Sequence, residues 1–580
     1  MIEGRITGID SKKITIEINP NEAQNQNLLN KYIVFNDGKK FVGEIYSINN
    51  TVAECYLLGF LEDNKFTFGD IIKPNFNSQI SLITKEELDT IFTENKETLK
   101  IGTSYIYDNY HIGLNINKFF SNHFAILGNT GSGKSYAVAS IIEKIFSEGE
   151  KSPFKSNFFI FDVYGEYKNC FTEISKKFNN INYKLITTDL SSKDEKLRIP
   201  FYLLDTDDIA LLLNAEQHSQ LSIIDKALNL VAIFKGKEED VLEFKNDIIA
   251  KCLLNIIYNN TNYRIRTQIV SILTKFNTKD INLDKVLTEG GWNISIKQCL
   301  FVDEKGKIQN IDLICKYLEK FVKLDIEYNR PKNIYYTIEE FYDALEFALI
   351  SEGILNSDKV FDYANILKVR LDSLIKSEKK EYFTYNDFVD KNKYICDLLI
   401  DKENKKYQVI NYNINSLDDR FAKVIVKMLS KWLFDFTTNL NPRAQFPIHI
   451  ILEEAHRYVQ KDNDVEVLGY NIFDRIAKEG RKYGILLGLI SQSPSELSKI
   501  TISQASNFLI FKMFHKEDLN FIEQIIPEVA GCTIDRLKTL YPGICIATGS
   551  SFKMPIIINI DLPEKAPNSR NVDIIETWYN

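Results

Sequence analysis

The chain has 580 residues, of which 44% are hydrophobic; this excludes global disorder and predicts about two to four domains. Its formal net charge of −8 excludes a protein that coats nucleic acid over its whole surface, so any nucleic-acid contact is expected to be local. The eight cysteines contain no C-x-x-C pair, and no apolar run approaches the ~20 residues of a membrane-spanning helix, so we expect a cytoplasmic protein with reduced thiols and no membrane segment.

The first hundred residues are rich in short runs of β-branched and aromatic side chains. The runs "GRITGID", "KITIEINP", "KYIVFNDG", "FVGEIYSI" and "AECYLLGFL" are separated by Gly, Asn and Asp, which favour turns. This spacing is typical of a small barrel or sandwich, and it assigns residues 1–100 to one β domain.

After the β domain, strands alternate with helices, and a long helical stretch interrupts the alternation. Strands are predicted at "NHFAILG", "KSNFFIFDVYGEY" and "INYKLIT", and again at "KYQVINYNI", "IHIILEE", "GILLGLISQS", "NFLIFKM", "GICIATG" and "PIIINI". Between the two groups, apolar residues recur at three-and-four spacing, as in "SQLSIIDKALNLVAIF". We therefore predict an α/β core with a parallel sheet in two parts, residues 101–205 and 386–580, and a helical insertion over residues 206–385.

A phosphate-binding loop follows the first strand of this core. "GNTGSGKS" matches G-x-x-x-x-G-K-[ST] between a predicted strand and a predicted helix, a context that a chance Gly-rich turn does not explain. Lys134 is expected to reach the β- and γ-phosphates, and Ser135 is expected to bind Mg²⁺. The residues expected to contact ATP are Gly128, Asn129, Thr130, Gly131, Ser132, Gly133, Lys134, Ser135 and Tyr136.

Two adjacent acids end the buried strand of "PIHIILEEAHRYVQ". Successive strand side chains point to opposite faces, so Glu453 and Glu454 are expected to do different jobs. Glu453 is assigned to the Mg²⁺ side and Glu454 to the attacking water as general base. Without a phosphate-binding loop, a pair of acids exposed to solvent would be the better interpretation.

Other strands of the same sheet also end in polar residues. Because nucleotides bind at the carboxyl ends of parallel strands, Gln492 is expected to orient water or sense the γ-phosphate. Asp162 and Glu166 follow a neighbouring strand and are expected at the edge of the site, without a named chemistry.

Arg481 lies in "EGRKYG", at the end of a predicted helix and before a strand. This position puts it toward the opposite end of the sheet from its own nucleotide. It either stabilises the helix dipole as a cation in the last turn or reaches a neighbouring subunit's γ-phosphate as an arginine finger. Residue chemistry alone leaves both interpretations open.

Several local patterns together resemble HerA-type ATPases of the HerA/FtsK group. They are "NINKFFSNHFAILGNTGSGKS", "FDVYGEY", "LRIPFYLL", "IILEEAHRYV", "FDRIAKEGRKYGILLGLISQSPSEL" and "LYPGICIATG", and the resemblance spans nearly the whole chain. The P-loop is generic, whereas the combination of "GEY", "EEAH" and "GRKYG" with "SQSPSEL" is specific. One departure is Tyr164 in "DVYGEY", where the family has His.

The resemblance implies a RecA-like P-loop core with a helical insertion, an N-terminal β-barrel and a homo-hexameric ring with double-stranded DNA in its channel. It implies ATP and Mg²⁺ as cofactors, and it favours the finger role for Arg481. It also implies a separate effector protein, either a sirtuin-type NAD hydrolase or a nuclease, and a role in antiphage defence.

Two functions follow from these observations. The first is an ATP-hydrolysing motor that translocates or unwinds double-stranded DNA. The second is a non-motor scaffold or switch that assembles and regulates a partner effector, which the acidic balance slightly favours. Stimulation of ATP hydrolysis by DNA separates the two.

Overall fold

The computed structural model of the chain contains two compact units. The first comprises Met1–Glu195, Ile395–Lys461 and Ile472–Asn580, and the second comprises Lys196–Tyr394 and Asp462–Asn471. The structure describes residues 4–11, 13–19, 27–63, 65–69, 71–92, 97–107, 110–147, 153–259, 262–288, 293–303, 307–323, 334–353, 358–526, 531–569 and 574–579.

The first unit begins with a seven-stranded antiparallel sheet in the order β1-β2-β5-β4-β3-β7, with β6 paired to β5. Its strands are β1 (Gly4–Ile9), β2 (Lys13–Ile18), β3 (Tyr32–Asn36), β4 (Lys40–Asn49), β5 (Val52–Glu62), β6 (Lys65–Phe68) and β7 (Gln79–Leu82), and helix α2 (Lys85–Phe92) follows. Burial alternates along β5, as expected where one sheet face covers a core. The prediction of a β-rich first hundred residues is confirmed, whereas closure into a barrel stays a prediction.

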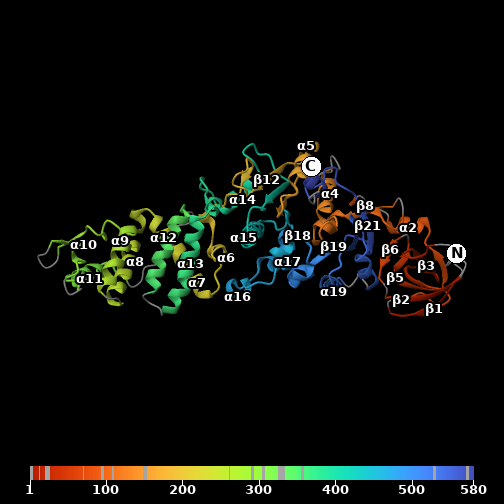
Figure 1. Cartoon of the computed structure of the whole chain (residues 1–580), viewed down its shortest axis with the longest axis horizontal. Helices are drawn as coiled ribbons and strands as arrows, with labels where there is room; N and C mark the ends of the chain where they lie inside the picture. The colour runs from red at the N-terminus through yellow and green to blue at the C-terminus, as the bar shows by residue number, and fades with distance from the viewer. Residues whose placement is uncertain are drawn as a thin grey trace. The chain divides into compact units, whose positions relative to one another are not determined.

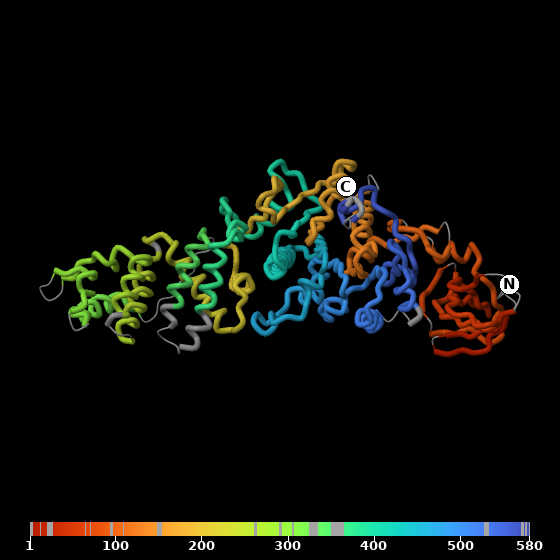
Figure 2. Tube along the Cα trace, viewed as in Figure 1, coloured from red at the N-terminus to blue at the C-terminus, as the bar shows by residue number. Residues whose placement is uncertain are grey.

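The rest of the first unit is built on a twelve-stranded sheet in the order β13-β12-β16-β11-β17-β18-β10-β19-β20-β21-β8-β9. The strands from β12 to β19 run parallel. They are β10 (His123–Leu127), β11 (Phe158–Asp162), β12 (Tyr183–Thr187), β16 (Val409–Asn413), β17 (Ile448–Leu452), β18 (Ile485–Ser491) and β19 (Ala505–Phe511), with the short β13 (Glu195–Lys196) at the edge. Segments far apart in the sequence thus interleave in one sheet (Figure 2).

The far side of this sheet differs from the predicted parallel arrangement. β20 (Ile544–Gly549), β21 (Ile556–Ile560), β8 (Thr98–Ser104) and β9 (His111–Asn115) all pair antiparallel. Only six residues separate β20 from β21, and so short a connection permits an antiparallel pair but not a parallel one. β8 and β9, which the sequence did not predict, extend the core sheet.

Several helices connect or follow the strands of this sheet in the chain. They are α3 (Ile116–Phe120), α4 (Lys134–Ser147), α5 (Lys168–Lys177), α14 (Lys391–Leu399), α15 (Asp419–Thr438), α17 (Ile472–Tyr483), α18 (Lys499–Ser503), α19 (Lys516–Ile525), α20 (Gly531–Leu537) and α21 (Ile574–Tyr579). α4 and α5 share one hydrophobic core with β8, β9 and β10. α17 packs against both α15 and β18 (Figure 1). The strands β10, β11, β17 and β18 are buried along their whole length, which explains their continuous apolar runs.

The second unit is mainly helical, and the helical insertion over residues 206–385 stays a prediction. Its helices are α6 (Thr206–Leu212), α7 (His218–Lys235), α8 (Glu238–Asn259), α9 (Asn262–Lys275), α10 (Ile296–Cys299), α11 (Ile311–Glu319), α12 (Ile338–Gly353), α13 (Asp358–Lys376) and α16 (Asp464–Leu468), beside a hairpin of β14 (Val286–Leu287) and β15 (Ile294–Ser295). α12 packs against α7 and α13. The unit also takes in Asp462–Asn471, where the Tyr470 hydroxyl donates to Asp207 at 2.8 Å. Across the described ranges, no helix combines the length and the apolarity that crossing a membrane requires.

Candidate nucleotide-binding and catalytic site

The loop Gly128–Ser135 connects β10 to α4 and has a backbone that glycine makes possible. Gly131 and Gly133 have φ values of 70° and 112°, in the left-handed region that other residues rarely enter. A Cβ on Gly133 would lie 3.0 Å from the Gly543 nitrogen, so the loop also packs closely on the chain before β20. A Cβ on Gly131 would meet nothing within 4 Å, which leaves open space inside the loop.

The polar groups of this loop fit a bound phosphate. Lys134 is 6% exposed, and its ammonium donates to the Asn129 carbonyl at 3.0 Å. Burial lowers the pKa of Lys134, and the Glu454, Glu453 and Glu166 carboxylates oppose this shift. The Ser132 hydroxyl is buried and has no hydrogen-bond partner among the described residues. A buried hydroxyl of this kind, beside a cation at a helix N-terminus, matches the chemistry of phosphate oxygens.

The sheet order brings the predicted acids and Gln492 to the loop. β10 lies beside β18, β18 beside β17, and β17 beside β11. In register, Leu127 pairs with Ser491, Leu452 with Leu489, and Phe161 with Leu452. The carboxyl ends of the four strands therefore meet at one edge, which places Glu453, Glu454, Gln492, Asp162 and Glu166 around the P-loop. Tyr136 lies half-buried in the first turn of α4.

Gln492 connects the P-loop to Glu454. The Thr130 hydroxyl donates to Gln492 Oε1, and Gln492 Nε2 donates to Glu454 Oε1. Glu454 is 4% exposed, and its Oε2 has no hydrogen-bond partner in the described part of the chain, although it lies 3.4 Å from His456 Nδ1. This leaves one buried carboxylate oxygen of Glu454 available to accept a proton from water.

Glu454 also has a strained backbone. Its φ and ψ are both 48°, the left-handed conformation, which is rare for a residue with a Cβ. Residues held this way concentrate at functional sites, where the surrounding structure fixes them.

Glu453 has different surroundings from its neighbour, as strand alternation predicts. The Tyr167 hydroxyl donates to Glu453 Oε1. Burial raises the pKa of Glu453 to about 8, and the nearby carboxylates of Glu454, Asp162 and Glu166 act in the same direction. Its assignment to Mg²⁺ stays a prediction, and the raised pKa disfavours the charged form that would bind a divalent cation.

Asp162 and Glu166 have different surroundings: Asp162 binds backbone groups of a turn, whereas Glu166 faces the P-loop. Asp162 accepts hydrogen bonds from the backbone nitrogens of Glu166 and Tyr167, both at 3.0 Å, and from Asn411 Nδ2 at 3.3 Å. It thereby fixes the turn that leads into α5. Glu166 faces the P-loop: burial raises its pKa, and the nearby Ser135 hydroxyl opposes this shift.

The structure keeps Arg481 away from this edge. Arg481 lies exposed in the last turn of α17, directly before β18 begins, whereas the P-loop follows the opposite end of β10. Burial lowers the pKa of His123, the first residue of β10, and the positive charge of Arg481 acts in the same direction. The placement near the amino ends of the strands agrees with the position that the sequence predicted.

Sequence reasoning missed Tyr167 and Asn411, which hold Glu453 and Asp162. Tyr167 belongs to the "GEY" pattern, but its partner comes from a strand almost three hundred positions away, a contact that spacing cannot predict. Asn411 could have been noticed in the sequence, because it is a polar residue inside the apolar strand β16, where its amide is fully buried. Buried amides need a partner, so it marked a polar neighbour on an adjacent strand.

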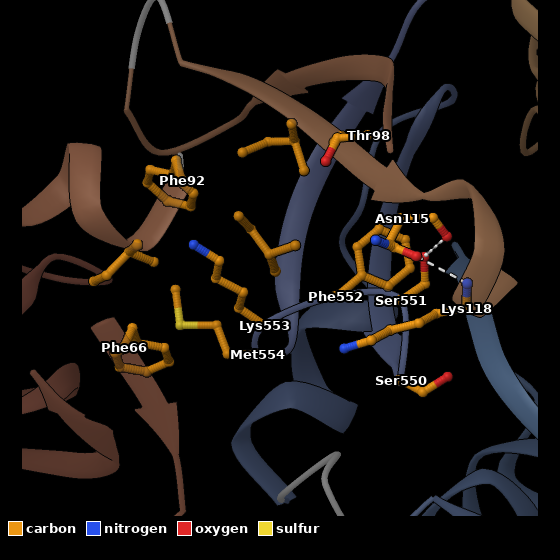
Figure 3. Close-up of a pocket in the computed structure, with 14 residues that line it drawn as sticks. Phe66, Phe92, Thr98, Asn115, Lys118, Ser550, Ser551, Phe552, Lys553 and Met554 are labelled. Carbon is orange, nitrogen blue, oxygen red and sulfur yellow. Dashed lines mark hydrogen bonds between the residues drawn. The ribbon is translucent and has the colours of Figure 1, made fainter. Parts of the chain in front are cut away.

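A cavity of about 340 Å³ lies elsewhere in the first unit (Figure 3). Its walls include Phe66, Phe92, Asn115, Lys118, Phe552 and Lys553. None of its lining residues belongs to the P-loop or to the strand ends that carry the acids, so it is not the nucleotide site.

Comparison with known proteins finds similarity to HerA helicases. The domain described as "Helicase HerA, central domain" matches residues 99–316. The chain is 26% identical over 523 residues to the DNA double-strand break repair helicase HerA of Sulfurisphaera tokodaii, covering 89% of this chain and 79% of that protein. It is 23% identical over 567 residues to a probable HerA helicase of Methanocaldococcus jannaschii, covering 93% and 92%.

Two solved structures are also similar. The VirB4 protein of Thermoanaerobacter pseudethanolicus matches with a TM-score of 0.45 and 13% identity, covering 82% of this chain and 98% of that one. The bacterial conjugative coupling protein TrwB matches with a TM-score of 0.46 and 9% identity, covering 84% and 93%. With a P-loop at the carboxyl edge of its sheet, the chain is a P-loop ATPase that is similar to HerA helicases over about nine-tenths of its length.

Proposed function

We propose that this chain is an ATP-hydrolysing motor that translocates or unwinds double-stranded DNA. The observation that carries the proposal is the hydrogen-bonded link from Thr130 through Gln492 to Glu454. It joins the phosphate-binding loop to a buried acid that has a free oxygen, which is the arrangement that hydrolysis requires. The HerA relatives are named as helicases of double-strand break repair, which supports DNA as the substrate.

In the proposed reaction, the P-loop backbone and Lys134 hold the phosphates of ATP, and Glu454 takes the proton of the attacking water. Gln492 contacts both sides and is placed to respond to the γ-phosphate. Ser135 is the group that would hold Mg²⁺, with the Glu166 carboxylate nearby and Glu453 at the same edge of the sheet. When bound, Mg²⁺ supplies positive charge against the phosphate oxygens.

The proposed working form is a homo-hexameric ring in which Arg481 acts on the nucleotide of the adjacent subunit. Its exposure and its distance from its own P-loop edge support this role. The proposal extends, on the family resemblance alone, to a separate effector, a sirtuin-type NAD hydrolase or a nuclease, and to antiphage defence.

Double-stranded DNA is expected to raise the ATP turnover of the purified full chain, measured by phosphate release. The control is Lys134→Ala, which is expected to lose about 10²–10³-fold in turnover because the phosphate charge is no longer met. ATP hydrolysis that DNA leaves unchanged, without DNA binding, would reject the motor and favour the regulatory scaffold. Near-normal turnover in Lys134→Ala would reject the P-loop assignment itself.

Glu166→Gln is expected to raise the Mg²⁺ concentration needed for half-maximal turnover by about 10–100-fold, since the acid that lies near Ser135 loses its charge. The measurement is a Mg²⁺ titration at saturating ATP. Glu173→Gln is the matched control, because Glu173 lies on the exposed side of α5 and pairs with Lys176 instead. Equal Mg²⁺ dependence in both variants would remove Glu166 from the metal side of the site.

A further inference from the structure

His123 links the P-loop strand to the helix that carries Arg481. It is the first residue of β10, whose last residue, Leu127, directly precedes the P-loop. The ring is 1% exposed and makes two hydrogen bonds. Nδ1 accepts from the Leu487 backbone nitrogen at 2.9 Å, and Nε2 contacts the Ala477 carbonyl at 3.1 Å. One side chain therefore joins β10, β18 and α17.

The hydrogen bonds define the form of the ring. A backbone N–H can only donate, so Nδ1 is the unprotonated acceptor and Nε2 carries the proton that is donated to Ala477. Burial, together with the charges of Arg481 and His449, lowers the pKa of His123 to about 4, although the bond to Ala477 opposes this shift. The ring therefore stays neutral at physiological pH, and its Nε2–H remains the donor to the Ala477 carbonyl.

The carbonyl that His123 holds belongs to the turn of Arg481. In an α-helix the carbonyl of one residue accepts from the N–H four residues later, and Ala477 precedes Arg481 by four positions within α17. The same turn is seated tightly on β18, because a Cβ on Gly480 would lie 2.5 Å from the Ile485 carbonyl oxygen. The Arg481 side chain forms no ion pair or side-chain hydrogen bond within the described residues, so only its backbone turn is held.

We propose that His123 is a positioning residue that couples the P-loop strand to the helical turn presenting Arg481 to the adjacent subunit. The inference rests on the proposed trans role of Arg481. β10 spans five residues, about 16 Å at the rise of a strand, and it is hydrogen-bonded on both sides. A shift of the P-loop with its nucleotide is thus transmitted along a stiff strand to the turn that acts on the next site.

Two substitutions separate the two bonds of His123. In His123→Asn, the amide oxygen takes the place of Nδ1 and keeps the bond from Leu487, but the side chain is too short for Ala477. In His123→Gln, the amide nitrogen takes the place of Nε2 and keeps the bond to Ala477, while the acceptor for Leu487 is lost. The proposal predicts that His123→Asn is impaired and that His123→Gln retains most of its turnover.

The expected loss in His123→Asn is about 10²-fold in turnover, the effect of misplacing a catalytic group by about 1 Å. ATP binding and ring mass are expected to stay normal. His449→Asn is the matched control: it also removes a buried ring near this edge, but that ring contacts the Phe120 carbonyl at 2.7 Å and not α17. Full turnover is expected in this control.

Mixing subunits shows whether the defect acts on the neighbouring site. Lys134→Ala subunits keep His123 and Arg481, so their well-placed finger should restore hydrolysis at the intact P-loop of an adjacent His123→Asn subunit. A structural defect in the P-loop strand itself would not be rescued in this way. Rescue in mixed rings, confirmed by mass, is the expected result.

Three outcomes would overturn the proposal: no rescue, equal loss in the Asn and Gln variants, or a His123→Asn chain that fails to assemble. A parallel mixture of Arg481→Ala with Lys134→Ala distinguishes the causes. If that mixture recovers activity and the His123→Asn mixture does not, only the role of His123 fails. If neither recovers, the trans finger fails as well.

Discussion

Alanine in place of Arg481 is expected to lower ATP turnover by about 10³–10⁵-fold while folding, ATP binding and ring assembly remain intact. The side chain is exposed and lies toward the amino ends of the strands, so its removal disturbs neither the core nor its own P-loop. In the proposed ring, the substitution removes positive charge that would act on the γ-phosphate of the adjacent subunit. Steady-state phosphate release, with nucleotide binding and native mass measured on the same samples, tests this expectation.

The complementation of two inactive variants provides the decisive control. Lys134→Ala subunits keep the finger and Arg481→Ala subunits keep the P-loop, so some interfaces in mixed rings contain both. Lys482→Ala is the matched control on the same helical turn, since Lys482 is also exposed. If Arg481 only stabilises the end of α17, its removal costs about 0.3–1 kcal/mol of stability. Turnover then stays near normal, and confirmed mixed rings gain no activity over their parents.

Glu454→Gln is expected to bind ATP normally and to hydrolyse it about 10²–10⁴-fold more slowly. The substitution keeps the shape of the side chain and an oxygen that accepts from Gln492, so the link to the P-loop is preserved. The amide oxygen is too weak a base to take the proton of water. Comparison of ATP affinity with single-turnover hydrolysis separates this effect from lost binding.

Glu453→Gln tests the division of labour between the two acids. Its carboxyl is buried and accepts from the Tyr167 hydroxyl, a bond that the amide oxygen of Gln can also accept. We expect it to keep far more activity than Glu454→Gln. Arrested hydrolysis in Glu453→Gln, together with an active Glu454→Gln, would reverse the assignment of the acids.

Several features of the site could be predicted from the sequence because they depend on residues that are close together in the chain. The P-loop pattern, the continuous apolar runs of β10, β11, β17 and β18, and the opposite directions of Glu453 and Glu454 follow from periods and turn chemistry. The polar residues at strand ends pointed to one edge, since parallel strands align their carboxyl ends. The structure confirms that these residues meet there.

The remaining features of the fold and the site depend on contacts between distant segments, which the spacing of apolar residues in the sequence does not predict. The strand order that puts β10 between β18 and β19, and the antiparallel addition of β8 and β9, arise from long-range contacts. So does the bond between Tyr167 and Glu453. The inclusion of Asp462–Asn471 in the helical unit is a packing outcome of the same kind. The roles of the individual site residues stay predictions until the variants are measured.

The left-handed backbone of Glu454 has a consequence for engineering this ATPase. A residue with a Cβ loses about 1–2 kcal/mol in that conformation, and glycine does not. Selection for thermal stability alone would therefore favour glycine at position 454. That substitution would remove the proposed general base. Stabilising substitutions should therefore be selected with Glu454 kept unchanged, because at this position a gain in folding stability would cost ATP turnover.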